Sequence, residues 1–174
     1  MPSEAREELW SQLAPYRQGY PQPRWLRPEN WHLTLVFLGN VRGHRARELV
    51  PVIDEVALRR RPVRAAVARA GGRVSNKDGV AWLGLEAGAG DVIETAEVVA
   101  AACPADITMG APPKRTPAAH LTIARRADRE LIAALETRSL GSLDAAWTID
   151  RIALVRSHLG PGGSRYETLH EVTL

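Results

Sequence analysis

The stretch HLTLVFLG, residues 32–39, places His32 and Thr34 in a run of otherwise apolar residues. Such a run is typical of a buried β-strand, where a polar side chain needs a specific reason. The pattern returns 88 residues later (120 − 32), where HLTIARRA begins with His120 and carries Thr122. Because side chains alternate along a strand, the histidine and the threonine of each motif project from the same face. The repeat predicts a duplicated fold in which each half carries one such strand.

Strands and helices alternate around the two motifs. Apolar periodicity and turn-forming residues predict strands at 31–38 and 118–124, hairpins of 62–69 with 79–85 and of 147–156 with 165–173, and helices at 3–17, 44–59, 91–103 and 128–137. Pro51 either kinks the second of these helices or marks its true first turn. We therefore predict an α+β fold of two pseudo-symmetric lobes, each of antiparallel strands with outer helices, around a central cleft. Both lobes belong to one domain spanning residues 1–174.

Composition excludes several classes of protein. A hydrophobic fraction of 45% and a charged fraction of 25% are typical of a globular chain rather than a disordered one. No apolar run approaches the ~20 residues of a transmembrane helix, and the N-terminus lacks the pattern of a signal peptide, so we expect a cytoplasmic protein. Cys103 is the only cysteine, which excludes an intramolecular disulfide and a cysteine-rich zinc site.

The charge of the chain favours an anionic ligand. The net charge is +3, and all but two of the 23 basic residues are arginines. The planar fork of arginine suits phosphate particularly well, although an arginine-rich chain can also reflect genome composition.

Two imidazoles and two hydroxyls suit the cleavage of a phosphodiester without a metal, provided that the two polar faces meet across the cleft. A neutral imidazole can take a proton from an attacking water or hydroxyl, while a protonated one on the opposite side donates to the leaving oxygen. Threonine hydroxyls can donate hydrogen bonds to the non-bridging phosphate oxygens. A single His-x-Thr would arise by chance about 0.3 times in this composition and would read as structural. Two copies that share the intervening leucine favour a functional role.

The chain resembles the two-histidine phosphoesterase superfamily, and more closely its RNA 2′,3′-cyclic phosphodiesterases, historically called 2′-5′ RNA ligases. The resemblance rests on RWLRPENWHLTLVFLGNV (24–41), PAAHLTIAR (117–125) and SHLGPGGSRYETL (157–169). It implies the bilobal α+β fold and hydrolysis of a 2′,3′-cyclic phosphate to a 2′-phosphate, with 2′-5′ RNA ligation as the reverse type of reaction. No ATP, metal or other cofactor is implied. The implied partners are RNA ends or small nucleotides with a cyclic phosphate, without a membrane, and we expect a monomer.

The resemblance also assigns roles to residues. His32 and His120 match the catalytic histidines, and which of them is the base stays open. Thr34 and Thr122 match the positions that contact phosphate. Arg125 matches a basic residue that often follows the second motif. Its odd offset from the histidine directs it to the other face of an ideal strand, so it reaches phosphate only if the strand ends or bends there, and a solvated arginine is the alternative.

Other interpretations remain open at this stage. The same chemistry could act on ADP-ribose 1″,2″-cyclic phosphate or on 2′-5′ oligonucleotides, or the cleft could bind RNA or nucleotides without turnover. Trp25 and Trp31 flank the first motif as core residues or as a stacking face for a base. Members of the family usually begin with a short apolar strand, whereas Met1 is followed at once by helix-like PSEAREEL, so we expect that strand to be missing. The remaining histidines lie in no metal-ligating pattern, and we expect no metal site.

Overall fold

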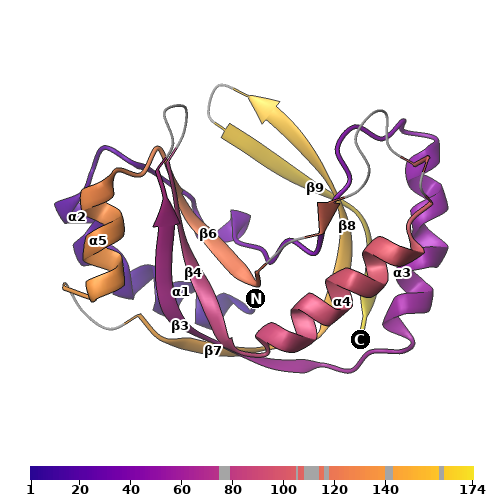
Figure 1. Cartoon of the computed structure of the whole chain (residues 1–174), viewed down its shortest axis with the longest axis horizontal. Coiled ribbons are helices and arrows are strands. Elements are labelled where there is room, and N and C mark those ends of the chain that lie inside the picture. The colour runs from indigo at the N-terminus through magenta and orange to yellow at the C-terminus, as the bar shows by residue number, and fades with distance from the viewer. Residues whose placement is uncertain (75–78, 105, 108–113, 116–117, 140–142, 161–162) are drawn as a thin grey trace. The chain divides into compact units, whose positions relative to one another are not determined.

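The computed structural model describes residues 1–74, 79–104, 106–107, 114–115, 118–139, 143–160 and 163–174 (Figure 1). The chain forms two compact units, each assembled from three separate stretches of sequence. Unit 1 comprises Met1–Leu33, Arg64–Ala89 and Ala118–Thr148, and unit 2 comprises Thr34–Val63, Gly90–Pro117 and Ile149–Leu174. Helices combine with antiparallel strands in this structure, which confirms the predicted α+β class. In the described part of the chain, no helix has the length and apolar character needed to cross a membrane.

Unit 1 is built on a five-stranded sheet with the strand order β1-β6-β4-β3-β7. The strands are β1 (Arg24–Trp25), β3 (Val63–Arg73), β4 (Val80–Ala87), β6 (His120–Arg125) and β7 (Ala145–Ile149). Strand β6 lies between β1 and β4, and it pairs antiparallel with both. The second histidine motif therefore lies inside the sheet, with neighbouring backbone on each side.

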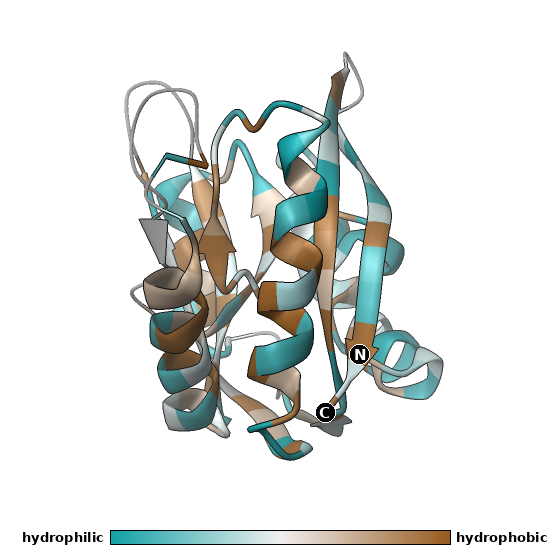
Figure 2. Ribbon diagram, turned by 90° about the vertical axis from the view of Figure 1, so that its right-hand side faces the viewer, coloured by the Kyte–Doolittle hydropathy of each residue, from teal (hydrophilic) through white to brown (hydrophobic). Residues whose placement is uncertain are grey.

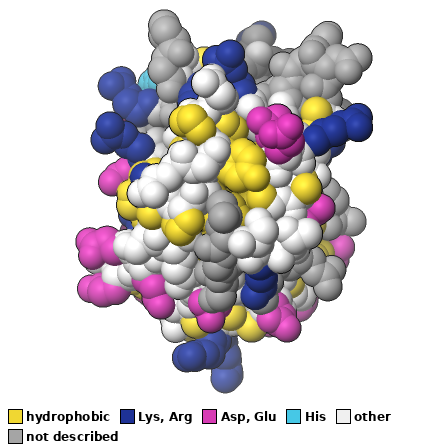
Figure 3. All heavy atoms as spheres, turned by 90° about the vertical axis from the view of Figure 1, so that its left-hand side faces the viewer, with side chains coloured by type: hydrophobic (Ala, Val, Ile, Leu, Met, Phe, Trp, Pro, Cys, Tyr) yellow, Lys and Arg dark blue, Asp and Glu magenta, His cyan; other side chains and the backbone are white. Residues whose placement is uncertain are grey.

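Helices cover one face of this sheet: α1 (Ser3–Gln12), α2 (Ala14–Gly19) and α5 (Arg129–Thr137). Figure 1 shows α2 and α5 on the same side of β3, β4 and β6. Gly72 of β3 marks the covered face, because a Cβ there would lie 2.4 Å from a side-chain carbon of Ile132 in α5. Space-filling atoms on this side of the molecule show acidic and basic side chains interspersed (Figure 3). The opposite face of the sheet carries the motif residues.

Unit 2 contains the helices α3 (Leu49–Ala57) and α4 (Ala89–Ala102), a long hairpin of β8 (Arg151–Gly160) with β9 (Gly163–Thr173), and the short pair β2 (Val36–Phe37) with β5 (Lys114–Arg115). Its core joins α3 and α4 to the inner half of the hairpin through Leu49, Ile53, Val56, Val99, Ile107, Ile152 and Leu154. Hydrophobic and hydrophilic residues alternate in bands along the helices (Figure 2), which is the pattern of helices half-buried on such a core.

The structure corrects three of the predicted elements and decides a fourth. The strand predicted at 147–156 is divided at Asp150, because β7 belongs to the sheet of unit 1 and only β8 forms the hairpin with β9. The strand predicted at 31–38 is interrupted: Leu33 makes an isolated bridge, the backbone bends at Leu35, and a strand resumes only at Val36. The chain leaves unit 1 at this point, so the apolar run serves two cores in succession. The helix predicted at 3–17 divides into α1 and α2 around Leu13. Pro51 lies in the first turn of α3, where its missing N–H has no helical acceptor to lose.

Candidate active site

A single antiparallel bridge joins the two histidine motifs. Leu33 pairs with Leu121, each the residue that follows its motif histidine. Residues on either side of an antiparallel bridge lie opposite each other in reverse order, so His32 lies across from Thr122. His120 is then the diagonal neighbour of His32, at the roughly 7–8 Å that separates diagonal positions. Both histidines belong to unit 1 and meet on adjacent backbone segments, rather than one from each unit as the duplication had suggested.

Both imidazoles are held by the same local hydrogen bond. His32 Nδ1 donates to the backbone carbonyl of Asn30 at 2.8 Å, and His120 Nδ1 donates to that of Ala118, also at 2.8 Å. In each case the acceptor lies two residues before the histidine. A carbonyl oxygen can only accept, so Nδ1 carries the proton in both rings and Nε2 is the nitrogen that gains or loses one. The two motifs thus repeat each other in ring orientation and in tautomer.

Burial along β6 shows which face the site occupies. His120 and Thr122 are half-buried, whereas Leu121 and Ile123 are at most 1% exposed. The apolar side chains point to the helix-covered face, and the polar ones project from the other. Gly84 of β4 pairs with His120 and brings no side chain to the position beside the imidazole.

An irregularity in β6 brings Arg125 to the face of the motif residues. On β4, Val80 and Trp82 are two residues apart and share a face, and their partners on β6 are Arg125 and Thr122. The register shift between these pairs inserts one extra residue in β6, as in a β-bulge. The burial pattern agrees, because Ile123 and the following alanine are both fully buried before Arg125 becomes half-exposed. The bend that the odd offset required is present.

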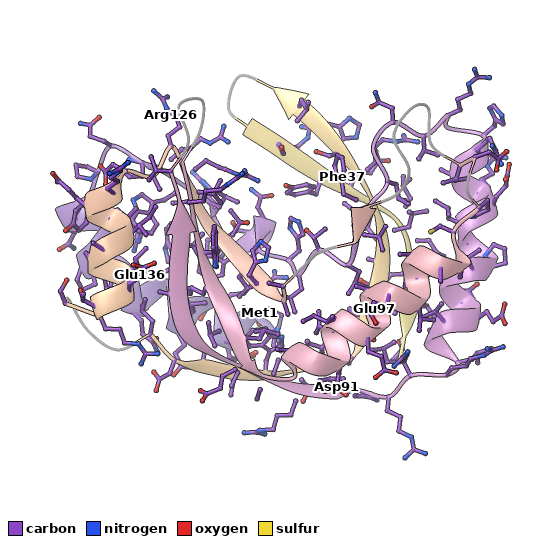
Figure 4. The ribbon with its side chains drawn as sticks, viewed as in Figure 1. Met1, Phe37, Asp91, Glu97, Arg126 and Glu136 are labelled. Carbon is purple, nitrogen blue, oxygen red and sulfur yellow. The ribbon has the colours of Figure 1, made fainter. Side chains whose placement is uncertain are left out.

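The next residue, Arg126, ends the strand. Its φ of 57° is in the left-handed region, and Figure 4 shows its side chain pointing away from the sheet at the end of β6. Arg125 and Arg126 therefore differ in direction although they are adjacent in sequence.

Trp82 is a residue of this face that the sequence did not single out. Its ring centroid lies 5.7 Å from that of His120, with the planes inclined by 55°. The indole also lies against Gly71 of β3, where a Cβ would be 3.1 Å from Nε1, so a glycine at that position makes room for the ring. The alternation of side chains along the strand VAWLGL (80–85) predicts that Trp82 lies on the face opposite to Leu83. Only the strand register shows that Trp82 reaches His120.

Thr34 and the flanking tryptophans have different positions. Thr34 is exposed and is the first residue of unit 2, so its role in the site stays a prediction. Trp31 is 3% exposed and packs edge-on against Trp10 at 5.9 Å, which confirms it as a core residue. Trp25 is half-buried, and its Nε1 donates to the carbonyl of Tyr20 at 2.9 Å.

Two histidines outside the motifs lie beside carboxylates, and both belong to unit 2. His158 lies 2.8 Å from a carboxylate oxygen of Glu167, and His170 lies 2.7 Å from one of Asp54. Hydrogen bonding from His158 lowers the pKa of the Glu167 carboxyl. Within the described ranges, no three histidine, cysteine or acidic side chains gather closely enough to hold a metal ion.

Comparisons with known proteins find a matching family model, a relative in sequence and solved structures of the same fold. The model of the 2′-5′ RNA ligase superfamily matches residues 2–161. An RNA 2′,3′-cyclic phosphodiesterase of Aquifex aeolicus is 28% identical over 160 residues, covering 87% of this chain and 81% of that protein. A crystal structure of a Thermus thermophilus protein superposes with a TM-score of 0.66 at 24% identity, over 100% of this chain and 93% of the other. Escherichia coli LigT complexed with NADP+ superposes with a TM-score of 0.68 at 21% identity and the same coverage.

Proposed function

The chain belongs to the 2′-5′ RNA ligase superfamily, and we propose that it hydrolyses 2′,3′-cyclic phosphates, at RNA ends or on small nucleotides, to 2′-phosphates without a metal. The observation that carries the proposal is the repeated setting of His32 and His120. Both rings stand on one sheet face as diagonal neighbours, and both present Nε2 because Nδ1 is tied to a carbonyl. Two such nitrogens can take up and donate protons on two sides of a single phosphorus atom.

The reaction needs one histidine in each protonation state. The neutral imidazole takes a proton from a water molecule while the oxygen of that water forms a bond to phosphorus. The bond from phosphorus to the 3′-oxygen breaks, and the protonated imidazole gives its proton to that oxygen, which leaves a 2′-phosphate and a 3′-hydroxyl. With an RNA 5′-hydroxyl in the place of water, the same displacement forms a 2′-5′ linkage.

The neighbouring polar groups stabilise the phosphate during this displacement. The Thr122 hydroxyl, beside both histidines in the register, donates to a non-bridging oxygen, and Thr34 does the same from the first motif. Arg125 shares the face of Thr122 through the bulge in β6 and adds a cation for phosphate to that face.

The relatives support phosphodiester chemistry on nucleotides. The Aquifex aeolicus protein bears the name of this activity, and it matches most of the present chain. LigT was crystallised with NADP+, whose adenosine carries a 2′-phosphate, the group that hydrolysis of a cyclic end would leave. A ribose phosphorylated like the proposed product was thus bound by a protein of this fold.

Product analysis in EDTA tests the proposal. The purified chain is incubated with 2′,3′-cyclic AMP and with a short RNA that ends in a 2′,3′-cyclic phosphate, and the products are separated beside authentic 2′- and 3′-phosphates. We expect the 2′-phosphate from both substrates. A 3′-phosphate would contradict the direction of displacement, and binding without product would show a recognition module instead. Turnover only of ADP-ribose 1″,2″-cyclic phosphate or of 2′-5′ oligonucleotides would retain the chemistry and replace the substrate.

A further inference from the structure

A row of three arginines crosses the sheet of unit 1 beyond the motif residues. Arg24 of β1 pairs with Arg125 of β6, Arg125 pairs with Val80 of β4, and Val80 pairs with Arg73 of β3. Directly paired residues of antiparallel strands share a face. The register therefore sets these three side chains in one line across four strands, interrupted only by a valine.

This line lies on the face of the two histidines. Gly72 faces helix α5, so Gly71 and Arg73, its neighbours along β3, face the other way. Gly71 contacts Trp82, which in turn contacts the ring of His120 on that same face. Arg24 and Arg73 are both exposed, so an arriving ligand can reach them.

The arrangement favours a bound anion. Like charges directly opposite on neighbouring strands destabilise a sheet, and Arg24 faces Arg125 in this way. Among the residues that the structure describes, no carboxylate forms an ion pair with Arg24 or Arg73. A phosphate beside the guanidinium groups of Arg24 and Arg73 would satisfy the planar donors of these two side chains.

Distances along the sheet give the row a role separate from that of the reacting phosphate. With about 3.3 Å per residue, Arg125 lies roughly 10 Å along β6 from Thr122, and Arg73 lies about two strand spacings, roughly 10 Å, from Arg125. Building on the proposed function, we propose that the row of Arg24, Arg125 and Arg73 binds backbone phosphates of the RNA strand that precedes the cyclic end. The substrate class is then an oligonucleotide in preference to a mononucleotide.

The test compares kcat/KM for a 2′,3′-cyclic mononucleotide with that for a short single-stranded RNA bearing the same cyclic end. The double variant Arg24→Ala/Arg73→Ala should lower the ratio of oligonucleotide to mononucleotide kcat/KM by about tenfold for each backbone phosphate that is no longer bound. Arg24→Gln/Arg73→Gln keeps the side-chain stems and should lower the ratio equally, should the alanine variant fold poorly. Arg129→Ala, an exposed arginine on helix α5 over the opposite face, makes the same kind of charge change and should leave the ratio intact.

The salt dependence of RNA binding provides a second readout that needs no turnover. Binding of the same oligonucleotide with an uncleavable 3′-end is measured at increasing salt, and the slope of log K against log salt should fall by about 0.7 for each phosphate that the variant no longer neutralises. An unchanged ratio and slope in both double variants would overturn the proposal, as would an equal loss in the Arg129 variant. Mononucleotide turnover without any preference for RNA would also overturn it while leaving the proposed hydrolysis intact. Absence of all turnover, with the slope change present, would instead refute the hydrolysis alone.

Discussion

Leu33 and Leu121 face each other in a lone antiparallel bridge, and this pair is the point about which the two histidine motifs repeat. Each leucine follows a histidine whose Nδ1 bonds to the carbonyl two residues upstream. The equivalence of the two rings is therefore built into backbone geometry. It explains why either imidazole is chemically suited to be the acid or the base.

Replacing either histidine should abolish most of the turnover and leave the fold intact. His32→Ala and His120→Ala should each lower kcat/KM for a 2′,3′-cyclic nucleotide by roughly 10²–10⁴-fold, the usual worth of one acid or base. Neither ring is fully buried, so thermal unfolding should occur at the wild-type temperature. His44→Ala, at an exposed position in unit 2, is the matched control. Wild-type turnover in either motif variant would contradict the acid–base assignment.

The glycine under helix α5 should be intolerant of a side chain. A Cβ at Gly72 would lie 2.4 Å from Ile132 and 2.9 Å from the carbonyl oxygen of Val80, so Gly72→Ala should lower the free energy of unfolding by roughly 1–3 kcal/mol. Gly90→Ala in α4 meets nothing within 4 Å and should raise it by about 0.4–1 kcal/mol. Chemical denaturation of the two variants measures both values. Equal stability of the two would show that α5 does not pack on Gly72.

The stability of helix α5 should depend on its N-cap residue, Asp128. Asp128 Oδ1 accepts a hydrogen bond of 2.8 Å from the backbone N–H of Leu131, so Asp128→Ala should cost roughly 0.5–2 kcal/mol in the free energy of unfolding. Asp128→Asn retains a capping oxygen and should recover most of this loss. If the asparagine and alanine variants unfold at the same denaturant concentration, the cap does not contribute.

The ion pairs of Arg45 with Glu48 and Asp106 in unit 2 should make the stability of the protein depend on pH. Hydrogen bonds from Arg45 lower the pKa of Glu48 and of Asp106 below their usual values of 4.5 and 3.8. Groups with a lowered folded-state pKa stabilise the fold above those values, and this contribution is lost as the pH falls through the folded pKa. Arg45→Gln should therefore be less stable than wild type at pH 7, with the difference shrinking towards pH 3. Urea titrations across this range measure it.

A variant at an exposed arginine is the control for that series. Arg61→Gln makes the same change of charge, and its difference from wild type should stay constant over the same pH range. A constant difference for Arg45→Gln as well would show that Arg45 does not couple to the two carboxylates.

Much of the fold follows from the sequence because periodicity and turn residues act locally. The strand predicted at 118–124 is β6, and the helix predicted at 128–137 is α5 with Asp128 as its cap. The motif histidines could be identified because the pattern occurs twice with the same following residue. The resemblance to the family is confirmed by the family model, which matches residues 2–161.

Other features depend on information that side chains do not carry. The carbonyls of Asn30 and Ala118 that orient the imidazoles belong to the backbone and have no sequence signature. The interruption at Leu35 is hidden because apolar residues suit the cores of both units equally well. The bulge before Arg125 does have a signal in the sequence, because two consecutive apolar residues, Ile123 and Ala124, interrupt the alternation of polar and apolar residues along the strand.

The interleaving of the two units constrains how this chain can be divided. The backbone passes from one unit to the other after each of the residues Leu33, Val63, Ala89, Pro117 and Thr148. No contiguous gene fragment therefore encodes one whole unit without part of the other. Recombination therefore cannot transfer either unit alone from one protein to another, and the two units are inherited and expressed together.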